Sequence, residues 1–347
     1  MKRYFCTYFN DSYLVYGLTM FRSLKKTGID FKLFVLCLDE PVYEKLKGAD
    51  PQLEPVRLSE LEIFDPETAA CKGNRSLVEY FFTLSPALPL YLFHRNPEID
   101  ILAYVDSDFM FFSTPEPIWK ELGEKSILIY EHDFSAHEEA IEKHGRFNVG
   151  FQLYRNNPAG TQVLQWWRGK CIEWCYDREE PGRFADQKYL DWWPELFPHD
   201  VVIAEKTKPQ GLAPWNMKKH AFSFVAGHLY SDGKPVIYFH FQNCKLLPPH
   251  LLWAPLWGEQ SIPWRYENYF YHSYWQALTD NLKIMDFSKD LLGGRSTVDH
   301  NLFDRSKKLR KLPSWLCYVG NLFFGIWRYH DIRPYGLRLF VARKYQA

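Results

Sequence analysis

An apolar stretch interrupted by two carboxylates is the feature that most constrains the fold of this chain. The stretch runs from Ile101 to Phe112, and Asp106 and Asp108 stand one residue apart within it. Charged side chains are seldom buried unless they are paired or bind a metal, and two neighbouring carboxylates repel each other. A divalent cation with oxygen ligands removes both problems. The alternative, a turn with solvated acids, is less favoured because both flanks are apolar.

The position of these acids predicts a site at a sheet edge. If the strand stops at Asp106, both carboxylates can lie at the carboxyl edge of a sheet, where open α/β folds bind their ligands. The chain has 347 residues and is 46% hydrophobic. It can therefore build one extended α/β domain with an appended region.

Charge and cysteine content exclude some classes of function. Lys+Arg and Asp+Glu both total 42, so no global charge favours nucleic acid as a partner. The 7 cysteines include no Cys-x-x-Cys pair, and we interpret them as reduced thiols. The N-terminus lacks the pattern of a signal peptide, and no apolar run is long enough to span a membrane. We expect a cytoplasmic protein.

Strand and helix patterns alternate along the chain. Predicted strands cover residues 3–7, 31–38, 101–105, 126–130, 148–154, 201–204 and 236–240. Predicted helices cover residues 12–26, 76–93, 158–176 and 186–193. This alternation predicts a mostly parallel sheet with helices on both faces.

The C-terminal part has a different composition, with prolines between runs of aromatic residues. From Arg305 onward, basic residues precede an aromatic, apolar segment. These residues are Lys307, Lys308, Arg310 and Lys311, followed by Trp315, Phe323, Phe324 and Trp327. The pattern fits an anchor on an anionic membrane surface. It fits a helix packed on the domain equally well.

Polar groups also follow the later strands or open the later helices. They are Phe147-Asn148-Val149-Gly150, Ala185-Asp186-Gln187, Ala213-Pro214-Trp215-Asn216 and His240-Phe241-Gln242-Asn243-Cys244-Lys245. In this order around Asp106-Ser107-Asp108, they resemble the GT-A nucleotide-sugar glycosyltransferases. The resemblance is to the retaining, galactosyltransferase-like and glycogenin-like enzymes of glycosyltransferase family 8, and it covers about residues 4–245.

The resemblance implies a fold and a metal site. The fold is an α/β GT-A fold, with a Rossmann-like, mostly parallel sheet flanked by helices. It implies a nucleotide-sugar-binding catalytic domain over residues 1–247. Residues 248–347 would be an aromatic and basic extension that associates with an acceptor or a membrane surface. Asp106, Asp108 and His240 would hold Mn²⁺ or Mg²⁺, and the nitrogen ligand favours Mn²⁺.

The same resemblance assigns roles to further residues. Asp186 and Gln187 would lie near the anomeric carbon of the donor sugar. Departures from the family pattern include Asn243 in place of a glycine and the absence of an arginine before Asp-x-Asp, which Arg75 or Lys72 would replace. The expected donor-binding residues are Thr7, Asn10, Tyr13, Arg75, Ser107, Asn148, Asn216 and Lys245.

Each residue also has a structural interpretation. His240 could be a hydrogen-bonded core histidine, Asp186 a helix N-cap and Asn148 part of a turn. Gln187 could lie on the surface and Trp215 could serve packing. Glu131 and Asp133 could contact donor-sugar hydroxyls or be solvated.

The resulting hypothesis is a metal-dependent glycosyltransferase. It would move a sugar from a nucleoside diphosphate sugar, with UDP favoured, to a hydroxyl of a glycan or lipid-linked saccharide, with retention. One competitor is a phosphatase of the haloacid-dehalogenase type, which requires threonine or valine where this chain has Met110. The other is an inactive glycan-binding protein on a GT-A scaffold, and the intact Asp106, Asp108 and His240 oppose it.

Overall fold

The structure is a computed structural model. It describes residues 1–135, 139–204, 211–247, 251–255, 263–284, 330–332 and 337–340. The chain divides into two compact units, Met1–His240 and Phe241–Ala347.

The first unit is built on a seven-stranded sheet with the order β3-β2-β1-β4-β7-β6-β8. Strand β7 runs antiparallel to both of its neighbours, and the other neighbours pair in parallel. The predicted mostly parallel α/β sheet is therefore confirmed, with β3 as a strand that the sequence analysis missed. The strands are β1 (Arg3–Phe9), β2 (Phe31–Cys37), β3 (Leu53–Arg57), β4 (Ile101–Val105), β6 (Ile127–Glu131), β7 (Phe147–Arg155) and β8 (Val201–Ile203).

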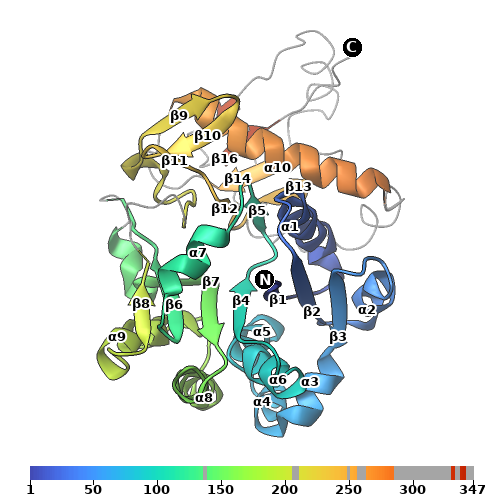
Figure 1. Ribbon diagram of the computed structural model, residues 1–347, viewed down its shortest axis with the longest axis vertical. Helices are drawn as coiled ribbons and strands as arrows, with labels where there is room; N and C mark the ends of the chain where they lie inside the picture. The colour runs from blue at the N-terminus through green and yellow to red at the C-terminus, as the bar shows by residue number, and fades with distance from the viewer. Residues whose placement is uncertain are drawn as a thin grey trace. The chain divides into compact units, whose positions relative to one another are not determined.

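Helices cover both faces of this sheet (Figure 1). On one face, α5 (Leu77–Leu84), α6 (Ala87–Arg95) and α8 (Pro158–Glu173) pack against a core that includes Cys6 and Tyr104. On the other, Phe5 contacts Trp119 of α7 (Glu116–Leu122), and Phe31 contacts Phe21 of α1 (Leu14–Lys26). Adjacent residues Phe5 and Cys6 serve opposite faces because strand side chains alternate.

Two predicted helices differ from the structure. The helix predicted over residues 76–93 is two helices, because Pro86 has no amide hydrogen to donate and breaks the run between α5 and α6. The helix predicted over residues 186–193 is instead a 3₁₀ helix, η4 (Gln187–Trp192), followed by α9 (Trp193–Leu196). The other helices of the first unit are η1 (Asp11–Tyr13), α2 (Glu40–Leu46), α3 (Leu58–Phe64), α4 (Pro66–Ala70), η2 (Cys71–Gly73), η3 (Glu139–His144) and η5 (Met217–Lys219).

The order in which strands are added to the sheet reverses between β1 and β4, which makes this position a topological switch point. From β1 the chain builds β2 and β3 on one side, and β4 then adds to the other side of β1. Ligands of open α/β folds bind beside such a switch, at the carboxyl ends of the strands. Asn10 follows β1 and Asp106 follows β4, so both lie at this edge.

Two smaller sheets complete the first unit. Strand β5 (Phe109–Phe111) pairs antiparallel with β12 (Tyr238–His240). Strands β9 (Phe222–Val225), β10 (His228–Ser231) and β11 (Lys234–Pro235) form an antiparallel sheet. The two-residue turn between β9 and β10 has positive φ at both Ala226 (49°) and Gly227 (81°), as type I′ hairpin turns require.

The second unit contains an antiparallel sheet and a long helix. The sheet has the order β13 (Lys245–Leu247), β14 (Leu251–Pro255), β16 (Leu337–Phe340) and β15 (His330–Ile332), and the helix is α10 (Trp264–Ile284). Phe241 stacks on Tyr274 of α10 with ring centroids 3.8 Å apart. The basic and aromatic segment at residues 307–327 lies outside the described residues. Among the residues that the structure describes, no helix is both long and apolar enough to cross a membrane.

Candidate functional site

Three predicted metal ligands meet at the switch between β1 and β4. Asp106 directly follows β4, and Asp108 directly precedes β5. The pairing of β12 with β5 sets His240 opposite Phe109. As a result, His240 Nε2 lies 3.2 Å from Asp108 Oδ1 and 3.9 Å from Asp106 Oδ2. One ligand atom from each residue lies within 4.8 Å of the others, which is the grouping that a shared cation needs.

The donor set and its surroundings fit a divalent cation. Two carboxylate oxygens and one imidazole nitrogen are ligands that suit Mn²⁺. The side chains of Asp106 and Asp108 are 30% and 16% exposed and that of His240 is 5% exposed, so the site is open on the aspartate side. Gly150 keeps this space free, because a Cβ there would lie 3.1 Å from Asp106 Oδ2 and 2.9 Å from Asn148 Oδ1.

The electrostatics of the site also favour a cation. Burial raises the pKa of Asp106 to about 6, and the negative charge of Asp108 adds to the rise. His240 and a hydrogen bond from Tyr104 act in the opposite direction. Two carboxylates this close repel each other, and a bound cation would stabilise both in their charged form.

Neighbouring side chains fix the imidazole of His240. Phe109 stacks on it with ring centroids 4.3 Å apart, and the edge of Trp215 meets it at 5.5 Å. Asn148 Nδ2 lies 3.5 Å from His240 Nδ1, on the opposite side of the ring from the aspartates. Such contacts orient a metal-binding histidine and restrict the rotation of its ring.

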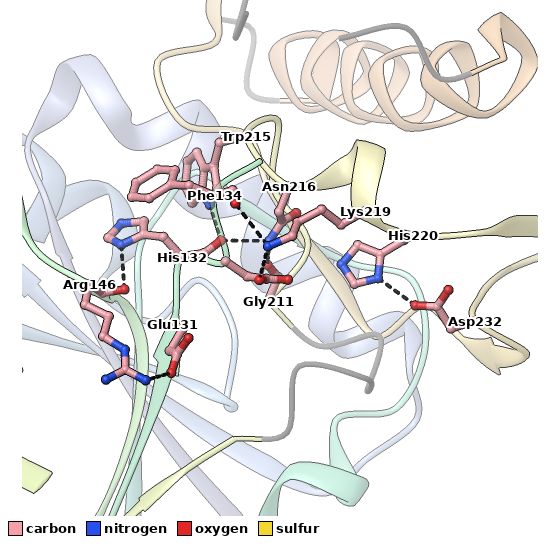
Figure 2. A network of polar contacts seen from close by, with 11 residues as sticks. Glu131, His132, Phe134, Arg146, Gly211, Trp215, Asn216, Lys219, His220 and Asp232 are labelled. Carbon is pink, nitrogen blue, oxygen red and sulfur yellow. Dashed lines mark hydrogen bonds and ion pairs between the residues drawn. The ribbon is translucent and has the colours of Figure 1, made fainter. Parts of the chain in front are cut away.

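Trp215 is itself held by the network in Figure 2. Its Nε1 donates to the carbonyl of His132 at 2.8 Å. Asn216 Nδ2 donates to the same carbonyl at 3.1 Å and to that of Gly211 at 2.7 Å, while its Oδ1 accepts from Ala213 N. Asn216 is 2% exposed, so its amide binds main-chain groups in this structure and holds the segment that carries Trp215.

Two acids at the end of β6 and just after it take part in ion pairs, and the pair formed by Glu131 is drawn in Figure 2. Glu131 pairs with Arg146, and Asp133 pairs with Lys219. Burial lowers the pKa of His132, which lies between them in sequence, to about 3. His132 is therefore a neutral side chain, stacked on Phe134 with ring centroids 4.6 Å apart.

Asp186 and Gln187 lie at a strained point of the backbone. Ala185, which precedes them, has a φ of 46°, a conformation that non-glycine residues rarely adopt. Burial raises the pKa of Asp186 to about 7, a hydrogen bond from Ser85 opposes the rise, and the charge of Asp106 adds to it. The Asp186 side chain makes no capping hydrogen bond to η4. Gln187 Nε2 donates to the His144 carbonyl at 3.3 Å.

The residues expected to bind the nucleoside follow β1. Tyr13 is 43% exposed, and burial followed by the charges of Asp108 and Asp106 raises its pKa to about 12. Tyr13 therefore lies close enough to Asp106 and Asp108 to feel their charges. Asn10 Oδ1 accepts a hydrogen bond from Ser12 at 2.7 Å. Thr7 is fully buried in β1, and its hydroxyl has no hydrogen-bond partner among the residues that the structure describes.

The remaining predicted donor contacts have varied surroundings. Ser107 is 8% exposed between the two aspartates. Arg75 donates to the Ile172 carbonyl at 3.2 Å and lies 3.9 Å from the ring centroid of Tyr176. Lys245 belongs to the second unit, where its Nζ lies 6.0 Å from the ring centroid of Trp253.

The sequence analysis missed Tyr104, which contacts the candidate metal ligand Asp106. Its hydroxyl donates to Asp106 Oδ1 at 2.7 Å. The signal was present, because residues two apart on a strand point to the same side and Tyr104 stands two positions before Asp106.

Structure comparison finds glycosyltransferases. The galactosyltransferase LgtC, solved with donor and acceptor sugar analogues, gives a TM-score of 0.49 at 15% identity, over 81% of this chain and 96% of LgtC. Apo mouse xyloside xylosyltransferase 1 gives 0.42 at 12% identity, over 70% of this chain and 98% of that protein. GlyE of Streptococcus pneumoniae TIGR4 gives 0.44 at 15% identity, over 84% of this chain and 64% of that chain.

Sequence comparison finds similar proteins in Bacillus subtilis (strain 168). The uncharacterized protein YfnF is 32% identical over 258 residues, which cover 71% of this chain and 83% of YfnF. The uncharacterized protein YfnD is 31% identical over 248 residues, which cover 70% of this chain and 78% of YfnD. No family model matches the chain. At this identity over this length, the chain belongs to the same protein family as YfnF and YfnD.

Proposed function

We propose that this protein is a metal-dependent glycosyltransferase that takes its sugar from a nucleoside diphosphate sugar. The observation that carries the proposal is the approach of Asp106, Asp108 and His240 at the carboxyl edge of the sheet, beside the switch between β1 and β4. Diphosphates bind at this edge in open α/β folds. A cation held there by these three residues would neutralise charge on a departing diphosphate and so stabilise the transition state.

The metal is Mn²⁺ in this proposal, and the donor is a UDP-sugar. The imidazole of His240 beside two carboxylates favours Mn²⁺ over Mg²⁺. The preference for uridine rests on the resemblance of the sequence to glycosyltransferase family 8. The ring of Tyr13 is partly exposed, and the charges of Asp108 and Asp106 add to the rise that burial causes in its pKa. A partly exposed ring near these aspartates supports a role in stacking on the base.

Asp186 and Gln187 act on the transferring sugar, and transfer proceeds with retention. This part of the proposal also rests on the family resemblance. Asp186 is buried and lies within electrostatic reach of Asp106, which supports a place beside the metal-bound donor. In its charged form it would stabilise positive charge that develops on the sugar ring.

The acceptor is a hydroxyl of a glycan or lipid-linked saccharide, and the enzyme works in polysaccharide synthesis at the cytoplasmic face of a membrane. This rests on the basic and aromatic pattern of residues 307–327. Replacement of Lys307, Lys308, Arg310 and Lys311 by glutamine should abolish sedimentation with anionic liposomes at low salt and leave nucleotide-sugar hydrolysis intact. Retained sedimentation would contradict this part of the proposal.

A thermal-shift screen tests the main proposal. We expect UDP-sugars to raise the melting temperature in the presence of Mn²⁺ and to have little effect in EDTA. Release of UDP from the stabilising donor would then distinguish an enzyme from an inactive glycan-binding protein. Hydrolysis of a simple phosphate ester, with no response to any nucleotide sugar, would favour the haloacid-dehalogenase alternative.

A further inference from the structure

The two carboxylate oxygens of Asp106 have different surroundings. Oδ1 accepts a hydrogen bond from the Tyr104 hydroxyl at 2.7 Å, whereas Oδ2 lies 3.9 Å from His240 Nε2. Of the two oxygens of Asp106, Oδ2 is the one that borders the space at Gly150, where a Cβ would lie 3.1 Å from it. One oxygen is thus held by the protein, and the other faces the candidate metal position.

We propose that Tyr104 is a positioning residue for the metal, and that it holds Asp106 Oδ1 so that Oδ2 remains available to the cation. The inference deepens the proposed function and rests on it. Tyr104 does not touch the cation in this proposal, because its hydroxyl is engaged with the carboxylate. It acts by fixing the rotation of a ligand, as hydrogen-bond partners of metal ligands commonly do.

The position of Tyr104 is well defined by its own contacts. It is 3% exposed in β4, and its ring packs against that of Tyr8 with centroids 5.8 Å apart. The Tyr8 hydroxyl lies 3.2 Å from Ser85 Oγ, in the short connection between α5 and α6. A buried ring held from two strands and a helix connection cannot rotate freely, so its hydroxyl presents a fixed donor to Asp106.

Ser85 also connects this row of hydroxyls to the second functional acid. Ser85 lowers the pKa of the Asp186 carboxyl group, against the larger rise that burial causes. Tyr104, Tyr8 and Ser85 thus lie between the carboxylate assigned to the metal and the carboxylate assigned to the sugar. Loss of the Tyr8 ring, which packs against Tyr104, should therefore loosen Tyr104 and weaken metal binding less than loss of the Tyr104 hydroxyl itself.

Tyr104→Phe is the direct test, and Tyr154→Phe is its matched control. Both tyrosines are buried in neighbouring strands of the same sheet face, but the Tyr154 hydroxyl donates to Gln152 and not to a metal ligand. Mn²⁺ affinity is measured by electron paramagnetic resonance of free Mn²⁺, with the full-length protein and no donor. The melting temperature in EDTA is measured in parallel.

We expect Tyr104→Phe to weaken Mn²⁺ binding by about 10- to 100-fold, which is the usual cost of losing a partner of a metal ligand. Tyr154→Phe should bind Mn²⁺ as the wild type does. Equal Mn²⁺ affinity of Tyr104→Phe and wild type would overturn the inference, as would equal weakening by both substitutions. If Tyr104→Phe does not fold, Tyr8→Leu decides, because it removes the ring that packs against Tyr104: weaker Mn²⁺ binding supports the inference, and unchanged binding overturns it.

The wild-type protein separates this inference from the function on which it rests. If wild type does not bind Mn²⁺, the metal-dependent function fails and the inference fails with it. If wild type binds Mn²⁺ and responds to UDP-sugars while Tyr104→Phe binds Mn²⁺ equally well, only the role of Tyr104 is excluded.

Discussion

His240 Nε2 lies 3.2 Å from Asp108 Oδ1, although the two residues are far apart in the chain. The contact depends on one short pairing, in which β12 returns antiparallel to β5 and places His240 opposite Phe109. Because β5 starts directly after Asp108, this pairing joins the last strand of the first unit to the Asp-x-Asp turn. The candidate metal site therefore forms only when the first unit is fully folded.

Asp108→Asn should sharply weaken Mn²⁺ binding. The substitution keeps the size of the side chain but removes the charge that a cation needs. Because the loss of an outer partner already costs about 10- to 100-fold, loss of a ligand charge should cost at least about as much. Isothermal titration with Mn²⁺ measures this, with Asp100→Asn at a surface ion pair as the control. Wild-type affinity in Asp108→Asn would remove the metal role of that residue.

Asp186→Asn should lower kcat more than it raises the KM for the donor. A group that acts mainly in the transition state changes the chemical step, because only differential stabilisation alters kcat. Loss of one such electrostatic contact typically lowers kcat by about 100-fold or more. Steady-state kinetics with the donor identified by thermal shift would measure both constants. A rise in KM with unchanged kcat would instead mark Asp186 as a binding residue.

The stability of the metal-free protein should depend on pH through Asp186. Burial raises its pKa to about 7, whereas an aspartate in an unfolded chain titrates near about 3.9. Between these values the unfolded state has lost a proton that the native state keeps, so the free energy of unfolding falls as pH rises. Between pH 4 and pH 7, the free energy of unfolding should fall by roughly 2–4 kcal/mol through this group.

Asp186→Asn removes this titration, and it should therefore be more stable relative to wild type at about pH 8 than at about pH 4. Urea denaturation in EDTA at the two pH values measures the difference. If the gap between variant and wild type is the same at both, the proton on Asp186 does not contribute to stability.

Asn216→Ala should lower the free energy of unfolding as well as weaken any donor binding. The substitution leaves the carbonyls of His132 and Gly211 and the amide of Ala213 without the partners that Asn216 provides. Leaving a buried polar group unpaired costs about 1–3 kcal/mol. Urea denaturation measures the loss, and Asn156→Ala is the control because the bond from that half-buried amide to the Pro97 carbonyl is long, at 3.5 Å. Unchanged stability with weaker donor binding would favour the predicted donor contact.

The sequence alone determined the fold class and the central acids of the site. The apolar run from Ile101 to Val105 and its neighbours predicted a mostly parallel sheet, because a strand buried on both faces reads as a continuous apolar segment. Asp106 and Asp108 were identified from the same run, since charges next to a buried strand need a partner. Both properties depend on residues that are close together in the chain, so the sequence alone is enough to predict them.

Only the tertiary structure decided which distant groups meet these acids and what each one contacts. His240 reaches Asp108 through the pairing of β5 with β12, and β5 is too short to be recognised from its sequence. The amide of Asn216 binds main-chain groups around His132, and Asp186 is buried without capping η4. Such contacts join segments far apart in the chain, and their geometry is set by packing, which no local pattern encodes.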